Sequence, residues 1–180
     1  MGVVVALLRG INVGSHNRIA MPALRDALAD AGLPGARTYV QSGNIVLDSD
    51  RSAAAVASAV GDVITERFGL SIPVVVRTRD ELASVVALNP LRDVVTEPKR
   101  YQVSFLAEEP APEVIELLNG LAAEPERLLA VGRELYAWHP DGVARSKLWE
   151  GLAGKKLGVL ATARNWTTVT TLLEMADASV

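Results

Sequence analysis

The topology of this chain can be read outward from the stretch Arg37-Thr-Tyr-Val-Gln-Ser-Gly-Asn-Ile-Val-Leu47. It predicts two short strands, 37–41 and 45–47, around Ser42-Gly43-Asn44, because glycine and asparagine suit the positive φ angles of a tight hairpin turn. Such a hairpin places two antiparallel strands side by side. The elements before and after it then fix the fold of the first half of the chain.

Before the hairpin, Val3–Leu8 predicts a buried strand because the run is short, continuous and rich in valine. A helix follows from about Pro22, since proline suits the first turn of a helix. After the hairpin come a helix capped by Asp50 and a strand at Pro73–Arg77. The order β-α-β-β-α-β is the ferredoxin-like pattern.

The second half predicts a similar order. A capping box at 78–81 opens a helix, and a strand at Tyr101–Leu106, a helix from Pro112 and a hairpin around Gly132-Arg133 follow. Helices are expected at about 146–153 and 166–176, and Leu157–Leu160 is the candidate for a weak last strand. We therefore predict an α/β (α+β) fold of two tandem ferredoxin-like halves, the second without a clear last strand. The predicted domains are 1–77 and 78–180, with one compact unit as the alternative.

Composition narrows the functional classes. The chain has 180 residues, 49% apolar and 22% charged, which is typical of a globular protein. It has no cysteine and only two histidines, so we expect no disulfide, no metal site and no cofactor. The apolar run at Val3–Leu8 is too short for a signal sequence or a membrane span, and we expect a cytoplasmic protein without a membrane partner.

Positive charge is concentrated in Arg145–Asn165. This segment holds five basic residues against one acid, a net charge of +4, whereas the whole chain has a net charge of −3. Three of the four lysines, Lys147, Lys155 and Lys156, lie here. A basic segment on an acidic protein is where an anion would be attracted. Lys147 is either paired with Glu150 or, as a minority interpretation, a group that transfers protons.

Three polar segments supply candidate ligand-binding residues. In Arg9–Gly14 the glycines would let the backbone approach a phosphate, but the spacing fits no nucleotide motif, and a turn with two positive φ angles explains it equally. The hairpin tip is most simply a turn, although tips can also line clefts. In Thr162–Thr168 either Asn165 or Thr162 can cap the last helix, and Arg164 can bind a carboxylate or phosphate. The predicted ligand-binding set is Arg9, Asn12, Gly14, Arg18, Gln41, Ser42, Asn44, Lys147, Lys155, Arg164 and Asn165.

Motifs for hydrolytic enzymes are absent from the sequence. There is no G-x-S-x-G, no H-E-x-x-H and no evident Ser-His-Asp set. Glu124 and Glu126 are interpreted as solvent-facing acids, and His139, which precedes Pro140-Asp-Gly142, as a turn residue.

Five segments in order resemble the bacterial family of unknown function DUF1697. They are Ala6-Leu-Leu-Arg-Gly-Ile-Asn-Val-Gly14, Arg37-Thr-Tyr-Val-Gln-Ser-Gly-Asn44, Gly132-Arg-Glu-Leu-Tyr136, Arg145-Ser-Lys-Leu148 and Thr162-Ala-Arg-Asn-Trp166. The resemblance extends over essentially the whole chain. It implies a soluble protein built from ferredoxin-like parts, and it implies no activity or catalytic residue.

The leading hypothesis is a protein that binds a small anionic metabolite, with turnover left open. The site would combine the Gly10–Gly14 loop with the basic segment. A nucleic-acid-binding module is one alternative, disfavoured by the isoelectric point near 5.4 and the 4% of aromatic residues. A homodimer formed through the edges of the sheets is the other.

Overall fold

The structure is a computed structural model and describes residues 2–179. The chain divides into two compact units. Unit 1 comprises Met1–Ala83 with Thr171–Val180, and unit 2 comprises Ser84–Thr170. The sequence placed the boundary between residues 77 and 78; in the structure the first division comes after Ala83, and the end of the chain returns to unit 1.

Unit 1 is a four-stranded antiparallel sheet with two helices between its strands. Its elements are β1 (Gly2–Leu8), α1 (Met21–Asp30), β2 (Arg37–Tyr39), β3 (Asn44–Ser49), α2 (Ala53–Phe68) and β4 (Val74–Thr78), followed by α3 (Arg79–Leu88). The strand order is β2-β3-β1-β4. This is the ferredoxin-like arrangement that the sequence predicted. One detail differs, because Ser52 rather than Asp50 caps α2 and accepts a hydrogen bond from the backbone N–H of Ala55.

Unit 2 repeats this topology. A short 3₁₀ turn at Pro98–Arg100 leads to β5 (Tyr101–Leu106), α4 (Pro112–Leu121), β6 (Arg127–Val131), β7 (Glu134–Trp138), α5 (Lys147–Ala153), a second 3₁₀ turn η2 (Lys155–Leu157), β8 (Ala161–Asn165) and α6 (Trp166–Asp177). The strand order, β6-β7-β5-β8, matches that of unit 1 strand for strand. Both predicted halves are therefore confirmed.

The last strand of unit 2 corrects the sequence-based prediction. It is well formed and lies at Ala161–Asn165, where it pairs with β5 from Gln102 to Leu106. Leu157–Leu160, the predicted candidate, instead contains the end of the η2 turn and Gly158 at a φ of +69°. A strand cannot run through a left-handed residue that closes such a turn.

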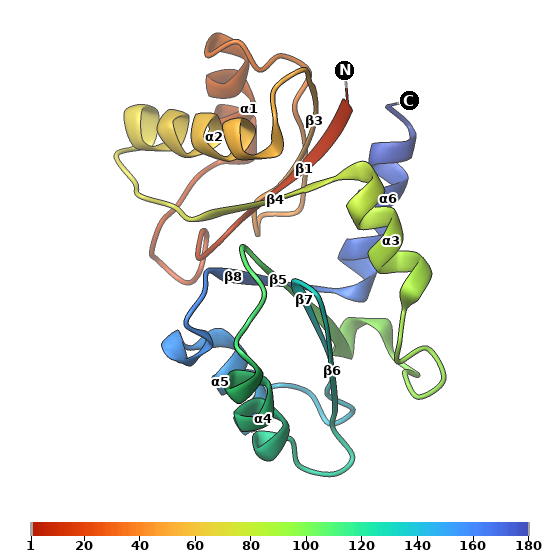
Figure 1. Ribbon diagram of the computed structural model, residues 1–180. Helices are drawn as coiled ribbons and strands as arrows, with labels where there is room; N and C mark the ends of the chain where they lie inside the picture. Colours follow the sequence, from red (N-terminus) through yellow and green to blue (C-terminus); the bar gives the residue numbers. More distant parts are fainter. Residues whose placement is uncertain (1, 180) are drawn as a thin grey trace. The chain divides into compact units, whose positions relative to one another are not determined.

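Each unit has its own core between one face of its sheet and its two helices (Figure 1). In unit 1 the alternate residues Val4, Ala6 and Leu8 pack with buried residues of α1 and α2. In unit 2, Leu106 packs with Leu118 of α4 and with buried leucines of α5. None of the helices within residues 2–179 is both long and apolar enough to span a bilayer.

Candidate functional site

Asn12 joins two of the predicted segments in unit 1. Its side-chain N–H groups donate to the carbonyl oxygens of Ile19, at 3.0 Å, and Gln41, at 2.7 Å. Its Oδ1 accepts the backbone N–H of Ile19 at 2.9 Å. The amide is therefore bonded to backbone groups on both sides, and it fixes the loop at 9–18 against the hairpin between β2 and β3.

The neighbouring predicted residues are also engaged in turn structure. Asn44 is buried and donates to the Tyr39 carbonyl at 2.9 Å and to the Ser42 hydroxyl at 3.0 Å. Gly10 and Gly14 have φ angles of +70° and +57°, as the turn interpretation of this loop requires. The side chains that remain exposed are those of Arg18, Gln41 and Ser42, while Arg9 is half-buried.

The basic segment of unit 2 surrounds a cavity of about 560 Å³. Lys147 from the first turn of α5 and Lys155 and Lys156 from η2 line it. All three lysines are exposed, and Glu150 is the single acid in the lining. The remaining lining residues are Leu121, Gly151 and Gly154. We call this the lysine cavity.

Close packing between helices positions this cavity. A Cβ atom on Gly151 would lie 2.8 Å from Leu121 Cδ1, so α5 packs closely against the leucine side chains of α4 at this glycine. Leu121 of α4 and three residues of α5 line the cavity, and the segment after α5 adds Gly154, Lys155 and Lys156.

Arg164 and Asn165 are not among the residues that line the lysine cavity. Asn165 Oδ1 accepts the backbone N–H of Thr168 at 2.9 Å, so Asn165 rather than Thr162 caps the last helix. Arg164 is buried and donates to the Thr162 hydroxyl and the Ala163 carbonyl, both at 2.8 Å. Burial lowers the pKa of Arg164 to about 10, so it still carries its charge at neutral pH.

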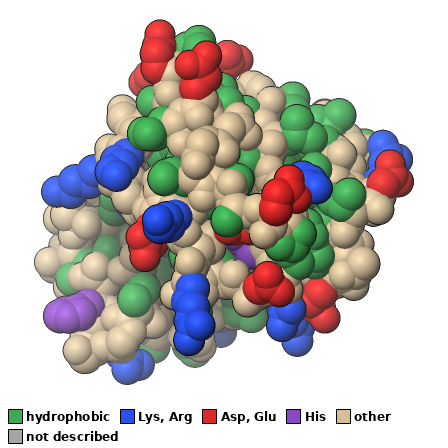
Figure 2. Space-filling model, turned by 90° about the horizontal axis from the view of Figure 1, so that it is seen from below, with side chains coloured by type: hydrophobic (Ala, Val, Ile, Leu, Met, Phe, Trp, Pro, Cys, Tyr) green, Lys and Arg blue, Asp and Glu red, His purple; other side chains and the backbone are tan. Residues whose placement is uncertain are grey.

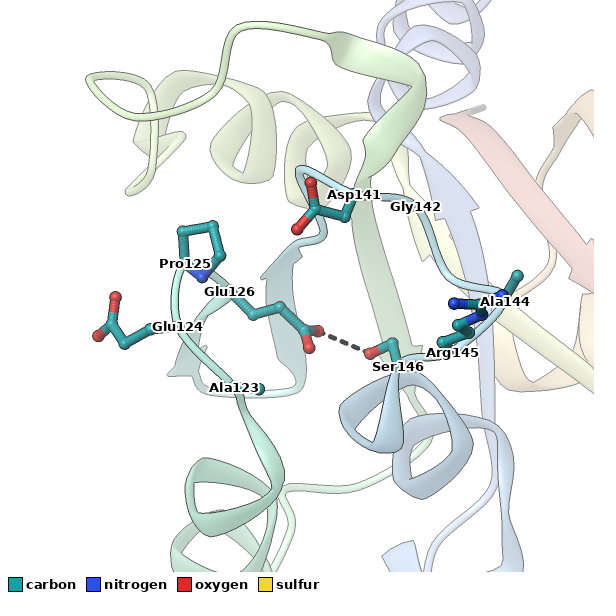
Figure 3. A pocket seen from close by; sticks show the side chains of 9 residues that line it. All are labelled: Ala123, Glu124, Pro125, Glu126, Asp141, Gly142, Ala144, Arg145 and Ser146. Atoms are coloured by element: carbon teal, nitrogen blue, oxygen red, sulfur yellow. Dashed lines mark hydrogen bonds between the residues drawn. The ribbon is translucent and has the colours of Figure 1, made fainter.

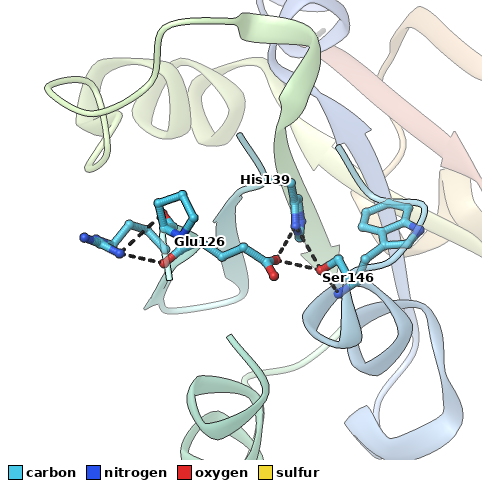
Figure 4. A network of polar contacts seen from close by, with 6 residues as sticks. Glu126, His139 and Ser146 are labelled. Carbon is cyan, nitrogen blue, oxygen red and sulfur yellow. Dashed lines mark hydrogen bonds and ion pairs between the residues drawn. The ribbon is translucent and has the colours of Figure 1, made fainter. Parts of the chain in front are cut away.

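A cluster that the sequence analysis missed lies at the start of α5 (Figure 4). Glu126 Oε2 is 2.7 Å from His139 Nδ1, and the Ser146 hydroxyl donates to the same carboxylate oxygen at 2.6 Å. Ser146 also caps α5 by accepting the backbone N–H of Trp149 at 3.0 Å. The interpretation of Glu126 as solvent-facing is therefore wrong: its side chain is only 13% exposed, and His139 is fully buried.

The cluster has the residue types of a nucleophilic triad but not its geometry. In such a triad the hydroxyl contacts one imidazole nitrogen and the carboxylate contacts the other. Here Ser146 and Glu126 both approach Nδ1 of His139, at 3.2 and 2.7 Å, while the buried Nε2 has no hydrogen-bond partner. The arrangement anchors the end of β7 to the start of α5, and Ser146 is not activated as a nucleophile.

The pKa of His139 is lowered by burial, although the hydrogen bond to Glu126 acts in the opposite direction. Because a carboxylate oxygen accepts hydrogen bonds, the neutral ring is assigned its proton on Nδ1, and this N–H donates a hydrogen bond to Glu126. The ring also meets Trp149 edge to face, with centroids 5.8 Å apart.

Glu126 and Ser146 form part of the wall of a second cavity, of about 460 Å³ (Figure 3). Glu124, Asp141 and Arg145 also line it, so its lining has mixed charge with an excess of acid. Within residues 2–179, no three histidine or acidic side chains are grouped so that they could hold a metal ion.

The structure therefore brings together Lys147 and Lys155 of the predicted set in one cavity, and it joins the Asn12 loop to the hairpin within unit 1. These features define a tandem ferredoxin-like protein with a lysine cavity in its second unit. The family described as a protein of unknown function, DUF1697, matches residues 1–136, and the chain belongs to that family. The resemblance found in the sequence is thus confirmed.

A solved structure supports the fold over the full chain. A conserved bacterial protein from Streptococcus pneumoniae has 20% sequence identity and a TM-score of 0.76, and the similarity covers 97% of this chain and 98% of that one. At this identity the likeness shows the fold alone. No curated protein matches the sequence.

Proposed function

We propose that this protein binds a small anionic ligand, with phosphate-bearing metabolites as the leading class, in the lysine cavity of unit 2. The observation that carries the proposal is the gathering of three of the chain's four lysines around one cavity that has a single acid in its lining. Lysine binds phosphate as a compact point charge with three donors. A protein with a net charge of −3 would attract an anion at this place and repel it elsewhere.

The size of the cavity suits a small ligand, and its lining leaves turnover open. Its volume of about 560 Å³ is in the range of small-molecule sites. Its lining contains no hydroxyl, thiol or imidazole side chain, so Glu150 and the lysines are the groups that could transfer a proton there. The Glu150 carboxylate would repel a phosphate placed next to it and could accept a hydrogen bond from a hydroxyl group. It therefore suits a ligand that has a hydroxyl group near its phosphate.

A small ligand is favoured over nucleic acid. On the face shown in Figure 2, Lys and Arg side chains form no continuous stripe, and Asp and Glu side chains lie among them. Nucleic-acid-binding surfaces place many cations along a continuous stripe. The predicted unit 1 residues, Arg9, Arg18, Gln41 and Ser42 among them, belong to the other unit, and their contribution to the same site stays a prediction.

Lysine substitutions with a matched control test the proposal. Pyrophosphate, adenosine nucleotides and sugar phosphates would be titrated against wild type and a Lys155→Gln, Lys156→Gln double variant by calorimetry and thermal shift. Lys99→Gln is the control, because Lys99 is exposed and is the one lysine outside the basic segment.

We expect one class of anion to bind wild type and Lys99→Gln equally, and a ligand at about 100 times its Kd should add about 2.7 kcal/mol of stability. The double variant should bind about tenfold more weakly or worse, with unchanged unliganded stability, because two exposed lysines contribute little to folding. Equal affinity of the double variant and the control would show that the lysine cavity is not the site.

A further inference from the structure

Two valines in unit 1 are exposed on neighbouring loops. Val13 is 63% and Val40 is 47% exposed. They adjoin Asn12 and Gln41, whose side chain and carbonyl form the 2.7 Å hydrogen bond between the loop at 9–18 and the hairpin. The two apolar side chains therefore belong to loops that are bonded to each other, and each adds exposed apolar surface to them. We call this surface the valine loops.

The backbone at Val40 is in a conformation that is strained for valine. Its φ is +50°, in the left-handed region. Glycine and asparagine adopt this conformation readily, whereas β-branched residues are outliers there. The exposed side chain gains little from burial within its own unit. Strain of this kind is typical of positions that serve binding.

The two sequence segments that carry the valine loops contain basic residues and no acidic ones. Residues 9–25 and 31–47 contain four arginines and neither aspartate nor glutamate. Two of these arginines bond within unit 1, Arg25 to the Thr38 hydroxyl and Arg37 to the Met175 carbonyl. Arg18 is exposed in the same loop as Val13. A partner that fits this surface combines apolar side chains with carboxylates.

The chain itself carries a surface of that chemistry on α4. The helix α4 contains two glutamates and no lysine or arginine. On α4, Leu117 is 48% exposed, and Glu113 and Glu116 beside it are exposed as well. Glu113 lies one helical turn before Leu117, so the two share a face. An apolar side chain flanked by acids is thus available to meet valines flanked by arginine.

We propose that the valine loops of one molecule dock on the exposed face of α4 of a second molecule. Leu117 of one copy meets Val13 and Val40 of the other, and Glu113 and Glu116 face Arg18. The contact joins two different surfaces, so it is heterologous. Because only a few side chains take part, the association is weak, depends on concentration and weakens with salt.

Charge reversal at both surfaces provides a direct test by analytical ultracentrifugation. Wild type should associate at high concentration and low salt. Arg18→Glu and Glu113→Lys should each weaken this association about tenfold or more, because each places like charges together. An equimolar mixture of the two variants should associate again, since the reversed loop of one variant meets the reversed helix of the other. Arg51→Glu, an exposed reversal in unit 1 outside the valine loops, should behave as wild type.

Val40→Asn separates a binding role from a structural one. Asparagine tolerates the left-handed conformation, so the variant should unfold at a higher temperature than wild type and yet associate less. A wild type that stays monomeric at the highest soluble concentration would overturn the proposal. So would association that none of these variants changes, which would point to another face, such as the edge strand β6 with its exposed Leu129 and Val131.

Discussion

At the scale of single residues, His139 makes the stability of this protein depend on pH. Burial lowers its pKa in the folded state below the ordinary 6.5, against the opposing effect of Glu126. Below pH 6.5 the unfolded chain therefore takes up a proton that the folded chain resists. The free energy of unfolding should fall as the pH drops below about 6.5, by at most about 1.4 kcal/mol per pH unit for one proton, and should not depend on this group above that pH.

Urea unfolding between pH 5 and 8 would measure this effect. Variants at the two histidines, one buried and one exposed, can be compared in the same experiment. His139→Gln should be less stable than wild type at pH 7 but should lose less stability on acidification. His16→Gln should keep the wild-type slope, because His16 is exposed. If His16→Gln rather than His139→Gln flattened the profile, the assignment to the buried ring would be wrong.

At the scale of elements, the hairpin between β2 and β3 docks on the loop before it through Gly43. A Cβ atom there would lie 2.6 Å from Ile11 Cδ1 and 2.8 Å from Leu8 Cβ, and its φ is +84°. Gly35 has a similar φ of +76° but has open space around it. Both Gly→Ala changes should cost about 1 kcal/mol for the backbone, and Gly43→Ala should cost about 1–3 kcal/mol more for overpacking. Urea midpoints of the two variants measure the difference, and equal midpoints would contradict tight docking.

The same hairpin shows what local sequence can predict. Its turn, the strands beside it and the helices of both units follow from short patterns of apolar residues, glycine and proline, and they were predicted in the right order. The strand β8 was misplaced because Ala161-Thr-Ala-Arg-Asn165 has weak strand propensity, and pairing with β5 decides its position.

The candidate site was also predictable from the sequence only in part. Lys147 and Lys155 are close in sequence, so their charge clustering was visible before the structure. Glu126 and Ser146 lie 13 and 7 residues from His139 in no known motif, and only the folded chain shows that Glu126 and the ring are buried together. Conversely, the turn roles of Asn12 and Asn44 depend on which carbonyl groups the fold brings within reach.

At the scale of the whole molecule, the two units share two helices, and we expect them to unfold together. α3 and α6 each run across the division of the chain, and the end of α6 is held in unit 1 by Arg37, which donates to the Met175 carbonyl at 2.7 Å and to the Ser179 hydroxyl. All three tryptophans, Trp138, Trp149 and Trp166, belong to unit 2. Their fluorescence therefore reports on one unit, while circular dichroism reports on both.

Arg37→Ala should remove about 1–3 kcal/mol of stability from unit 1, because the Met175 carbonyl and the Ser179 hydroxyl lose their charged donor. If the helices couple the units, the tryptophan transition in unit 2 should shift to lower denaturant by the same amount as the circular dichroism transition, and the two should coincide. Lys99→Gln, a change at an exposed side chain of unit 2, should move neither curve. The opposite result would be a tryptophan transition at its wild-type midpoint together with a circular dichroism transition in two steps. Each ferredoxin-like unit would then fold on its own, and the shared helices would join the units without coupling their stabilities.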